Sequence, residues 1–259
     1  MSADTGRNAQ GPAEGKTGDT GVARLRSLHH GRSPGDPLVL PGPWDAASAR
    51  IFAEAGFEAL ATPSQGVSAS LGHADGDTPA DEMFAAITRI VRAVDVPITA
   101  DIERGYGLPP ERIVERLLES GAVGCNLEDS EGGQLVEPQR QADFLAQVHR
   151  AAGGRLLVNA RIDTYLRGSA DPLAEAVERG RLYVEAGAEC VYPIKAPLGD
   201  LGVLAAELKV PLNAWAPVGG GPSPRELGAA GASRITFGGG LAHLARAAVR
   251  ELAGSLREA

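Results

Sequence analysis

Eight short apolar segments alternate with eight segments of helical hydrophobic period between residues 37 and 256 of this chain. Apolar runs that are rich in β-branched side chains and bounded by turn residues predict strands buried on both faces, as in a parallel sheet. The predicted strands span residues 37–40, 59–62, 97–101, 122–127, 156–162, 190–194, 211–215 and 234–237. The predicted helices span residues 45–55, 80–94, 110–120, 138–152, 172–186, 198–208, 224–230 and 241–256. This alternation predicts an α/β fold of the (β/α)8 TIM-barrel type.

The ends of the predicted helices carry matching local signals. Asp171 and Ser223 each precede a proline, which places a capping side chain ahead of a proline in the first helical turn. Gly121 and Gly153 follow helical segments, where glycine commonly ends a helix. A doubly wound open sheet is the alternative architecture, but it normally has a Gly-rich phosphate-binding turn after the first strand. Residues 41–45 read Pro-Gly-Pro-Trp-Asp instead, so the barrel is favoured.

The chain is expected to form one folded domain over residues 21–259, because 259 residues are typical of a single α/β barrel. Residues 1–20 are rich in Gly, Ala and Asp without hydrophobic periodicity, and we expect them to be a disordered tail. Residues 22–30 are predicted to form a short helix ahead of the first strand.

Composition argues against several functional classes. The formal net charge is −8 and no basic stripe is present, so nucleic acid is not expected as a partner. No apolar stretch approaches the ~18 residues of a membrane span, and residues 1–20 contain no hydrophobic core of a secretion signal. Both cysteines, Cys125 and Cys190, lie within predicted strands, which favours a reducing compartment over a disulfide framework. We therefore expect a cytoplasmic protein with neither membrane nor nucleic acid as partner.

Two neighbouring predicted strands end in carboxylates. Side chains at i and i+2 of a strand face the same side, so Asp101 and Glu103 are predicted to point together, with Glu128 of the next strand beside them. Crowded carboxylates repel one another unless a cation or shared protons offset their charge, and oxygen ligands suit Mg²⁺ or Mn²⁺. The alternative is that some of these acids cap the following helices, which would explain Asp129 but not a same-side pair.

Further polar residues gather at the carboxyl ends of the strands, which form the functional face of a barrel. Asp75 lies in a loop predicted over residues 63–79, Arg161 lies near the end of the fifth strand, and Asn213 lies on the seventh. An arginine beside a metal suits a substrate with carboxylates, because the guanidinium binds a carboxylate in a two-pronged fork. The alternative for Arg161 is a structural ion pair with an acid of the fourth strand, and both roles can hold together.

Five segments carry recognisable motifs in order. They are residues 41–57, residues 67–72 with Asp75 after them, residues 101–107 (Asp-Ile-Glu-Arg-Gly-Tyr-Gly), residues 127–129 (Leu-Glu-Asp) and residues 159–161 (Asn-Ala-Arg). Together they resemble the isocitrate lyase/phosphoenolpyruvate mutase superfamily. The resemblance implies an α/β barrel, usually a tetramer whose eighth helix is often swapped between subunits. It also implies Mg²⁺ or Mn²⁺, an α-keto or α-hydroxy carboxylate substrate, and an enolate of a pyruvate-like fragment held on the metal.

Residue roles follow from the resemblance position by position. Asp101 resembles the direct metal ligand, and Glu103 and Glu128 resemble acids that reach the ion. Glu103 departs from the Asp of better-known members. The residues with implied or expected roles in catalysis are Arg161, Asp75, Tyr106 and Glu128, those for substrate binding are Thr62, Pro63, Ser64, Arg161 and Asn213, and those for the metal are Asp101, Glu103 and Glu128.

The segment after Asp129 departs further from the family. Isocitrate and methylisocitrate lyases carry a Lys-Lys-Cys-Gly-His loop here, and phosphonomutases carry a lysine and an Asn-Ser pair. Residues 130–137 read Ser-Glu-Gly-Gly-Gln-Leu-Val-Glu and have none of these. The expected function is therefore Mg²⁺-dependent C–C bond cleavage in an oxaloacetate- or methylisocitrate-like di-acid, by a lyase or hydrolase. The alternatives are a non-catalytic keto-acid-binding barrel and a phosphonate-forming phosphoenolpyruvate mutase-type isomerase.

The last predicted helix bears on assembly. Residues 241–256 place Leu241, Leu244, Leu252 and Leu256 at helical spacing, which gives one broad apolar face. An intrachain barrel needs such a face, and the family precedent adds burial between subunits. We expect a homo-oligomer, namely a tetramer.

Overall fold

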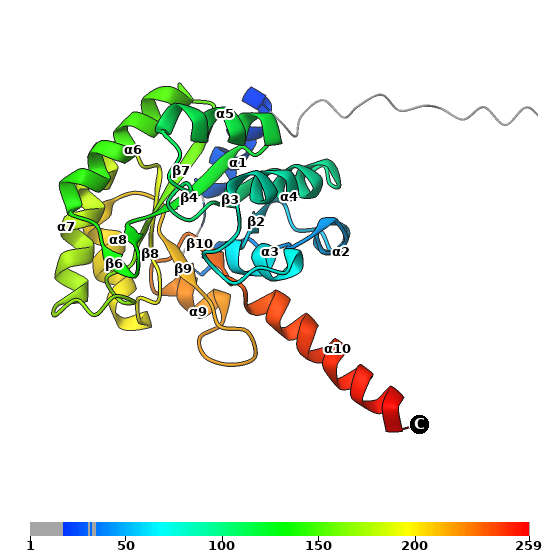
Figure 1. The fold of residues 1–259 in the computed structure, drawn as a ribbon. Coiled ribbons are helices and arrows are strands. Elements are labelled where there is room, and N and C mark those ends of the chain that lie inside the picture. Colours follow the sequence, from blue (N-terminus) through cyan, green and yellow to red (C-terminus); the bar gives the residue numbers. More distant parts are fainter. Residues whose placement is uncertain (1–17, 31, 33–34, 259) are drawn as a thin grey trace, which may run out of the picture.

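The computed structural model describes residues 18–30, 32 and 35–258, and they form a closed barrel of parallel strands ringed by helices (Figure 1). The barrel strands are β1 Leu38–Val39, β2 Leu60–Thr62, β3 Ile98–Asp101, β4 Gly124–Glu128, β7 Leu157–Ile162, β8 Cys190–Pro193, β9 Asn213–Trp215 and β10 Arg234–Thr236. The helices are α1 Gly18–His29, α2 Ala46–Glu54, α3 Ser64–Leu71, α4 Ala80–Arg92, α5 Pro110–Ser120, α6 Pro138–Ala152, α7 Pro172–Glu185, α8 Leu201–Leu208, α9 Pro224–Ala229 and α10 Gly240–Glu258.

The strands close into a ring through two sheets and two joining contacts. One sheet has the order β2-β3-β4-β7-β8 and the other β1-β10-β9, with every neighbouring pair parallel. A bridge between Val191 and Leu212 joins β8 to the start of β9. The amide of Ala61 donates to the carbonyl of Pro41 at 3.2 Å and joins β2 to the end of β1. The (β/α)8 prediction is confirmed, and the open doubly wound sheet is wrong.

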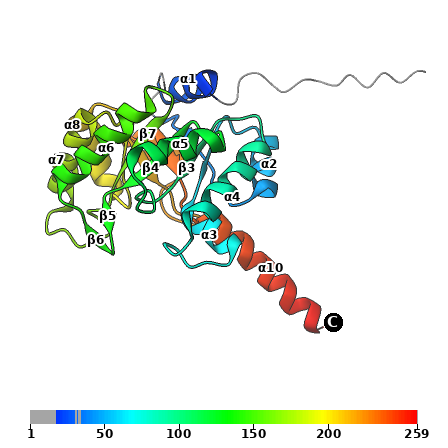
Figure 2. The same cartoon turned by 45° about the horizontal axis from the view of Figure 1, so that its top comes forward.

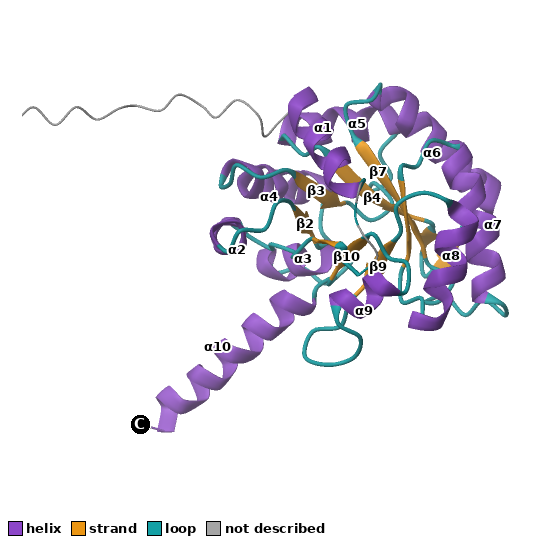
Figure 3. Ribbon diagram, turned by 180° about the vertical axis from the view of Figure 1, so that it is seen from behind, coloured by secondary structure: helices purple, strands orange, loops and turns teal. Residues whose placement is uncertain are grey.

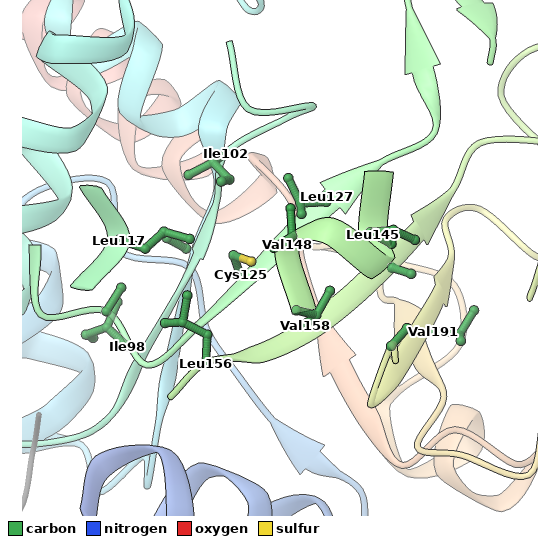
Figure 4. Packing of buried hydrophobic residues seen from close by; sticks show 14 of the residues in the cluster. Ile98, Ile102, Leu117, Cys125, Leu127, Leu145, Val148, Leu156, Val158 and Val191 are labelled. Atoms are coloured by element: carbon green, nitrogen blue, oxygen red, sulfur yellow. The ribbon is translucent and has the colours of Figure 1, made fainter. Parts of the chain in front are cut away.

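The main core lies between the strands and the surrounding helices. Ile98, Cys125 and Val158 point outward from β3, β4 and β7, and they pack with Leu117 of α5 and Leu145 of α6 in one buried cluster (Figure 4). Because side chains alternate along a strand, the residues beside these outward ones face the inside of the barrel. Figure 3 shows the helices arranged around the strands. This layering leaves the inward positions free for polar side chains.

Helix α1 covers the end of the barrel at which the strands begin (Figure 2). Val22 and Leu25 pack in a second buried cluster with Leu38, Val123 and other inward residues. Any Cβ at Gly124 would lie 3.1 Å from a Leu25 methyl carbon, so the helix fits closely against β4. Helix α1 begins at Gly18, ahead of the predicted start, and the rest of the predicted tail, residues 1–17, lies outside the described residues. In the part of the chain that the structure describes, α1 thus covers one end of the barrel, and the cavity lined by strand ends opens at the other.

Two local elements differ from the prediction. Helix α3 occupies part of the loop predicted over residues 63–79, and strands β5 Ser130–Glu131 and β6 Gln134–Leu135 form an antiparallel hairpin after β4. Both elements are short and rich in Ser and Gly, so neither shows hydrophobic periodicity.

No helix among the described residues is long and apolar enough to cross a membrane. Helix α10 projects away from the barrel with Leu244, Val249, Leu252 and Leu256 exposed (Figure 1).

Candidate active site

A cavity of about 810 Å³ opens at the carboxyl ends of the strands. Such a volume suits a small-molecule site. Each of several strands contributes residues at or just beyond its end, and the lining includes Thr62, Pro63, Ser64, Asp75, Asp101, Asn126, Arg161, Tyr192, Lys195, Trp215 and Thr236. The cavity therefore brings together most of the substrate-binding residues expected from the sequence.

Asp101 lies at the end of β3, beside the start of α3. Its Oδ2 accepts from the Ser64 hydroxyl at 3.2 Å and from the Ser64 amide at 3.5 Å. Its own amide donates to the Thr62 hydroxyl at 3.3 Å. A helix N-terminus has unpaired amides and attracts negative charge, so α3 holds this carboxylate in place. The position next to Thr62 and Ser64 agrees with the expected juxtaposition of metal and substrate groups.

Glu103 reaches the same area by a different route from the predicted one. Strand β3 ends at Asp101, and Glu103 has φ 53°, so the i, i+2 argument for a same-side pair in one strand is wrong. The turn follows from Gly105, whose φ is +85° and at which a Cβ would lie 2.3 Å from Ile113 Cδ1. The Glu103 amide still donates to Asp101 Oδ1 at 3.3 Å. Burial, and then the charges of Asp101 and Asp75, raise the pKa of Glu103 to about 7.

Glu128 and Asp75 complete the group of acids. Burial raises the pKa of Glu128 to about 8 against the opposing charge of Arg161. Asp75 lies in the exposed turn after α3, where Gln65 Nε2 lies 3.5 Å from its Oδ2. Partial desolvation and the charge of Asp101 raise the pKa of Asp75. Four carboxyl groups from three parts of the chain thus carry negative charge that their surroundings do not fully offset.

The donor chemistry of these acids fits a hard divalent cation. Among the described residues, no three His, Cys, Asp or Glu side chains are already arranged as a metal-binding group. Glu103 Oε1, however, is buried without a hydrogen-bond partner in that part of the chain. A buried, unpartnered carboxylate oxygen near other acids is stabilised by a cation, and oxygen ligands select Mg²⁺ or Mn²⁺. Asp101 could hold such an ion, and Glu103, Glu128 and Asp75 could reach it through side-chain movement or water.

Arg161 is held by two acids at the side of the cavity. Its Nε and Nη2 donate to the Asp163 carboxylate at 2.7 and 3.1 Å, and its Nη1 lies 2.8 Å from Glu128 Oε2. Burial opposes its charge, but Glu128 and Asp163 outweigh this effect and raise its pKa. A guanidinium has five N–H groups, so one on each Nη remains for a ligand. The expected fork to a substrate carboxylate is thus partly occupied by Asp163, which sequence reasoning did not assign.

Tyr106 and Asn213 do not line the cavity. The Tyr106 hydroxyl is buried without a partner among the described residues, and its ring packs edge-on against Phe84. Burial, and then the charges of Glu103 and Asp101, raise the pKa of Tyr106 well above its usual value. Asn213 begins β9 instead of ending it, is fully buried, and donates to Thr236 at 2.8 Å. Its predicted contact with substrate is therefore not supported.

Asn126 is a floor residue that the sequence did not single out as a site residue. Its Oδ1 accepts from Asn159 Nδ2 at 2.7 Å and from Arg234 Nη2 at 3.3 Å. Because both donors hold the oxygen, the Asn126 amide nitrogen is the atom left to face the cavity. Arg234 is fully buried inside the barrel, burial lowers its pKa, and its Nε and Nη1 have no partner among the described residues. A tertiary contact between β4 and β10 carries this arrangement, so no local motif predicts it.

The segment after β4 is a tethered hairpin. The Ser130 hydroxyl donates to Asp163 Oδ2 at 2.6 Å, and the amide of Val136 donates to the carbonyl of Asp129 at 2.8 Å. Asp129 itself is buried and accepts from Tyr183 at 2.8 Å and from Arg179 at 3.2 Å, so it is part of the scaffold. The hairpin takes the place at which the family resemblance implies a lyase loop.

Comparisons with known proteins agree with this architecture. The model of the phosphoenolpyruvate phosphomutase family matches residues 25–257. An uncharacterized protein of Mycobacterium tuberculosis (strain CDC 1551 / Oshkosh) is 34% identical over 216 residues, which cover 83% of this chain and 81% of that protein. The 2-methylisocitrate lyase of Aeropyrum pernix is 32% identical over 194 residues, 69% of this chain and 61% of the lyase. The structure of oxaloacetate acetylhydrolase with the product oxalate has a TM-score of 0.83 at 25% identity, covering 93% of this chain and 87% of that one.

Proposed function

This chain belongs to the phosphoenolpyruvate phosphomutase family, within the isocitrate lyase/phosphoenolpyruvate mutase superfamily, and we propose that it is a carbon–carbon lyase or hydrolase. The proposed substrate is a small 2-oxo or 2-hydroxy dicarboxylic acid of the oxaloacetate or methylisocitrate type, and the proposed cofactor is Mg²⁺ or Mn²⁺. The names of two related proteins specify acids of this kind. The observation that carries the proposal is that Asp75, Asp101 and Arg161 line one cavity, with Glu128 paired to Arg161 beside it.

The metal is assigned to the acidic side of the cavity. Asp101 is proposed as its direct ligand, and Glu103, Glu128 and Asp75 as acids that reach it. When bound, the ion would stabilise the negative charge that develops on the substrate oxygen at C2 during bond cleavage. Burial, and after it the charges of nearby acids including Asp101, raises the pKa values of Glu103 and Glu128, and this supports the placement because a bound cation would offset both effects.

Substrate recognition is assigned to groups around Asp101. The Thr62 hydroxyl and the Gln65 amide at the start of α3 are offered to one carboxylate of the acid, and Ser64 between them already donates to Asp101. Arg161 offers its remaining N–H groups, and Asn126 offers its amide nitrogen from the floor. These donors orient an acid whose reacting bond then lies over the floor of the cavity.

Proton handling is assigned to residues near the acids. Cleavage of the carbon–carbon bond leaves a carbanion that must gain a proton. The Tyr106 hydroxyl remains protonated at neutral pH because its pKa is raised, and since Tyr106 does not line the cavity it is proposed to donate through water. Glu128 and Asp75 are proposed to exchange protons with the substrate, because their raised pKa values lie nearer neutral pH than those of free acids.

The hairpin after β4 favours one alternative. It lacks the Lys, Cys and His of the lyase loop and is tied to Asp163 through Ser130, so a keto-acid-binding barrel without turnover is the second candidate. The retained acids and Arg161 favour the enzyme. A phosphonate-forming mutase is the third candidate, supported by the family model.

We also propose a homo-oligomer, most simply a tetramer, in the cytoplasm. The exposed leucines of α10 support assembly, because a projecting apolar helix needs a cover. The two cysteines are buried and unpaired, as is common in a reducing compartment.

A turnover screen tests the proposal. Oxaloacetate, 2-methylisocitrate and 2,3-dimethylmalate are incubated with the Mg²⁺-loaded protein, and release of oxalate or pyruvate is measured by coupled assay or mass spectrometry. Turnover of one acid by the wild type, lost in Asp101→Ala, is the expected result. Binding of these acids without any product supports the non-catalytic barrel, and conversion of 3-phosphonopyruvate to phosphoenolpyruvate supports the mutase.

A further inference from the structure

Two cations on the wall of the cavity have no acidic partner in the described part of the chain. Lys195 follows β8 and Arg246 lies on α10, and both line the cavity. Arg161, by contrast, is bound to Glu128 and Asp163. In a chain of net charge −8, unpaired cations at a cavity are the groups that attract an anion.

The position of Lys195 in the barrel separates it from the acids. The sheet order β2-β3-β4-β7-β8 continues through β9 and β10 to β1, so β8 lies four places from β2 and β9 lies four places from β3. In a ring of eight strands, four places correspond to opposite walls. Ser64 and Asp101 belong to the β2–β3 wall, and Lys195 and Trp215 belong to the β8–β9 wall. Lys195 therefore lies across the cavity from Ser64 and Asp101.

Lys195 is held in place instead of extending freely into solvent. Its Nζ lies 2.9 Å from the centroid of the Trp215 ring, a cation–π contact. Its φ is 65°, and among the described residues only three other non-glycine residues have positive φ, namely Glu103, Tyr106 and Lys209. Strained backbone of this kind tends to occur at functional sites. Burial lowers the pKa of Lys195 and no acid opposes this effect, which agrees with the lack of a carboxylate nearby.

We propose that Lys195, supported by Trp215, forms an anion subsite for the second acidic group of the substrate. This inference rests on the proposed function, because the first carboxylate is assigned to the side of Asp101 and Arg161. The second group is a carboxylate or a phosphonate, and the subsite selects acids with two anionic ends over mono-acids of the same length.

Binding of matched acids tests the subsite without relying on turnover. Oxaloacetate and 2-oxobutyrate share four carbons and a 2-oxo acid group, but only oxaloacetate has a second carboxylate. Their dissociation constants are measured with Mg²⁺ by calorimetry and by tryptophan fluorescence, and 3-phosphonopyruvate serves as the phosphonate probe. We expect Lys195→Met to weaken binding of the doubly charged acid by ~10-fold, the typical effect of losing a charge-assisted contact, and to change 2-oxobutyrate binding by less than ~2-fold.

Two further variants control for the backbone and for charge. Lys209 has φ 55° at the end of α8 and does not line the cavity, so Lys209→Met changes the same residue type in the same conformation. It is expected to leave both affinities unchanged, and Lys195→Arg is expected to retain most of the di-acid affinity. Three results would overturn the subsite. Lys195→Met could weaken binding of both acids equally, it could change neither affinity, or both doubly charged probes could fail to bind the wild type. If Lys195→Met selectively weakens di-acid binding but the wild type releases no product, the subsite stands and the proposed lyase activity is refuted.

Discussion

Glu128 and Arg161 are register partners on β4 and β7, and Arg161 Nη1 lies 2.8 Å from Glu128 Oε2. On its other side the same guanidinium is bound by both oxygens of Asp163. The arginine therefore fixes one acid of the proposed metal site and also offers N–H groups to a substrate. The ion pairs of Arg161 with Glu128 and Asp163 are therefore compatible with the proposed contact between Arg161 and a substrate carboxylate.

Arg161→Lys is predicted to lower kcat/KM by at least ~10-fold on the best substrate, because an ammonium cannot contact Asp163, Glu128 and a substrate carboxylate together. Mg²⁺ affinity should change much less, because arginine is not a ligand. Steady-state kinetics and calorimetry measure the two effects. Arg181→Lys, at an exposed ion pair with Glu207, is the matched control and should be neutral. Full activity of Arg161→Lys would make Arg161 purely structural.

Arg234→Met is predicted to weaken substrate binding without lowering stability. A buried guanidinium with unpartnered nitrogens is costly, so its removal should leave the melting temperature unchanged or higher. Asn126 would lose one of the donors that orient it, so KM should rise ~5-fold or more while kcat changes less. Asn126→Asp, which places an acceptor where the amide donates, should raise KM further. An unchanged KM in both variants would show that Asn126 does not contact the substrate.

His29 is predicted to make stability depend on pH. It is buried under the barrel, and burial, then the charge of Arg234, lower its pKa to about 3 from 6.5. Between pH 3 and pH 6.5 the unfolded chain binds more protons than the folded chain. The contribution of neutral His29 to stability is therefore complete above pH 6.5 and is lost as the pH falls toward 3. From pH 6.5 to pH 5, the free energy of unfolding should fall by about 2 kcal/mol more in the wild type than in His29→Gln.

Denaturant titrations at each pH measure this difference. His30→Gln changes the exposed neighbouring histidine and should behave as the wild type. Parallel pH profiles for the wild type and His29→Gln would contradict the assignment.

Helix α10 is predicted to mediate assembly. Leu252 and Leu256 are 59% and 71% exposed on the projecting helix. Such an apolar surface is unusual on a monomer and often marks an interface. Light scattering of the wild type at micromolar concentration should show an oligomer, and Leu252→Glu combined with Leu256→Glu should shift it toward the monomer. A monomeric wild type would refute the proposal.

Hydrophobic pattern predicted the barrel because buried parallel strands and amphipathic helices have distinct periods, and each predicted barrel strand overlaps an observed one. It failed at α3, since residues 64–71 are small and polar and the helix depends on tertiary contacts. Glu103 was grouped correctly with Asp101 for the wrong reason, because the chain turns after β3 instead of continuing as a strand. Asn213 was misplaced because it lies two residues before the end of β9, where its side chain is buried and donates to Thr236.

The candidate site was predictable where a motif carries it and not where a distant contact does. Asp163 follows the last residue of β7 and stands two residues after Arg161, so extending the alternation by one residue could have revealed it. Asn126 and Lys195 lie at or just after strand ends, which the sequence indicates, but the contacts that orient them come from other strands. No local pattern marks Arg234. Tertiary geometry is therefore needed to show that Lys195 lies across the cavity from Asp101.

Metal binding at Asp101 is the central claim, and calorimetric titration of Mg²⁺ or Mn²⁺ into the wild type and Asp101→Ala tests it most directly. We expect one metal site per chain in the wild type, and at least a ~10-fold loss of metal affinity in Asp101→Ala. Asp81→Ala, which removes an exposed acid paired with Arg116, should bind the ion as the wild type does. Equal affinity in the wild type and Asp101→Ala would contradict the account.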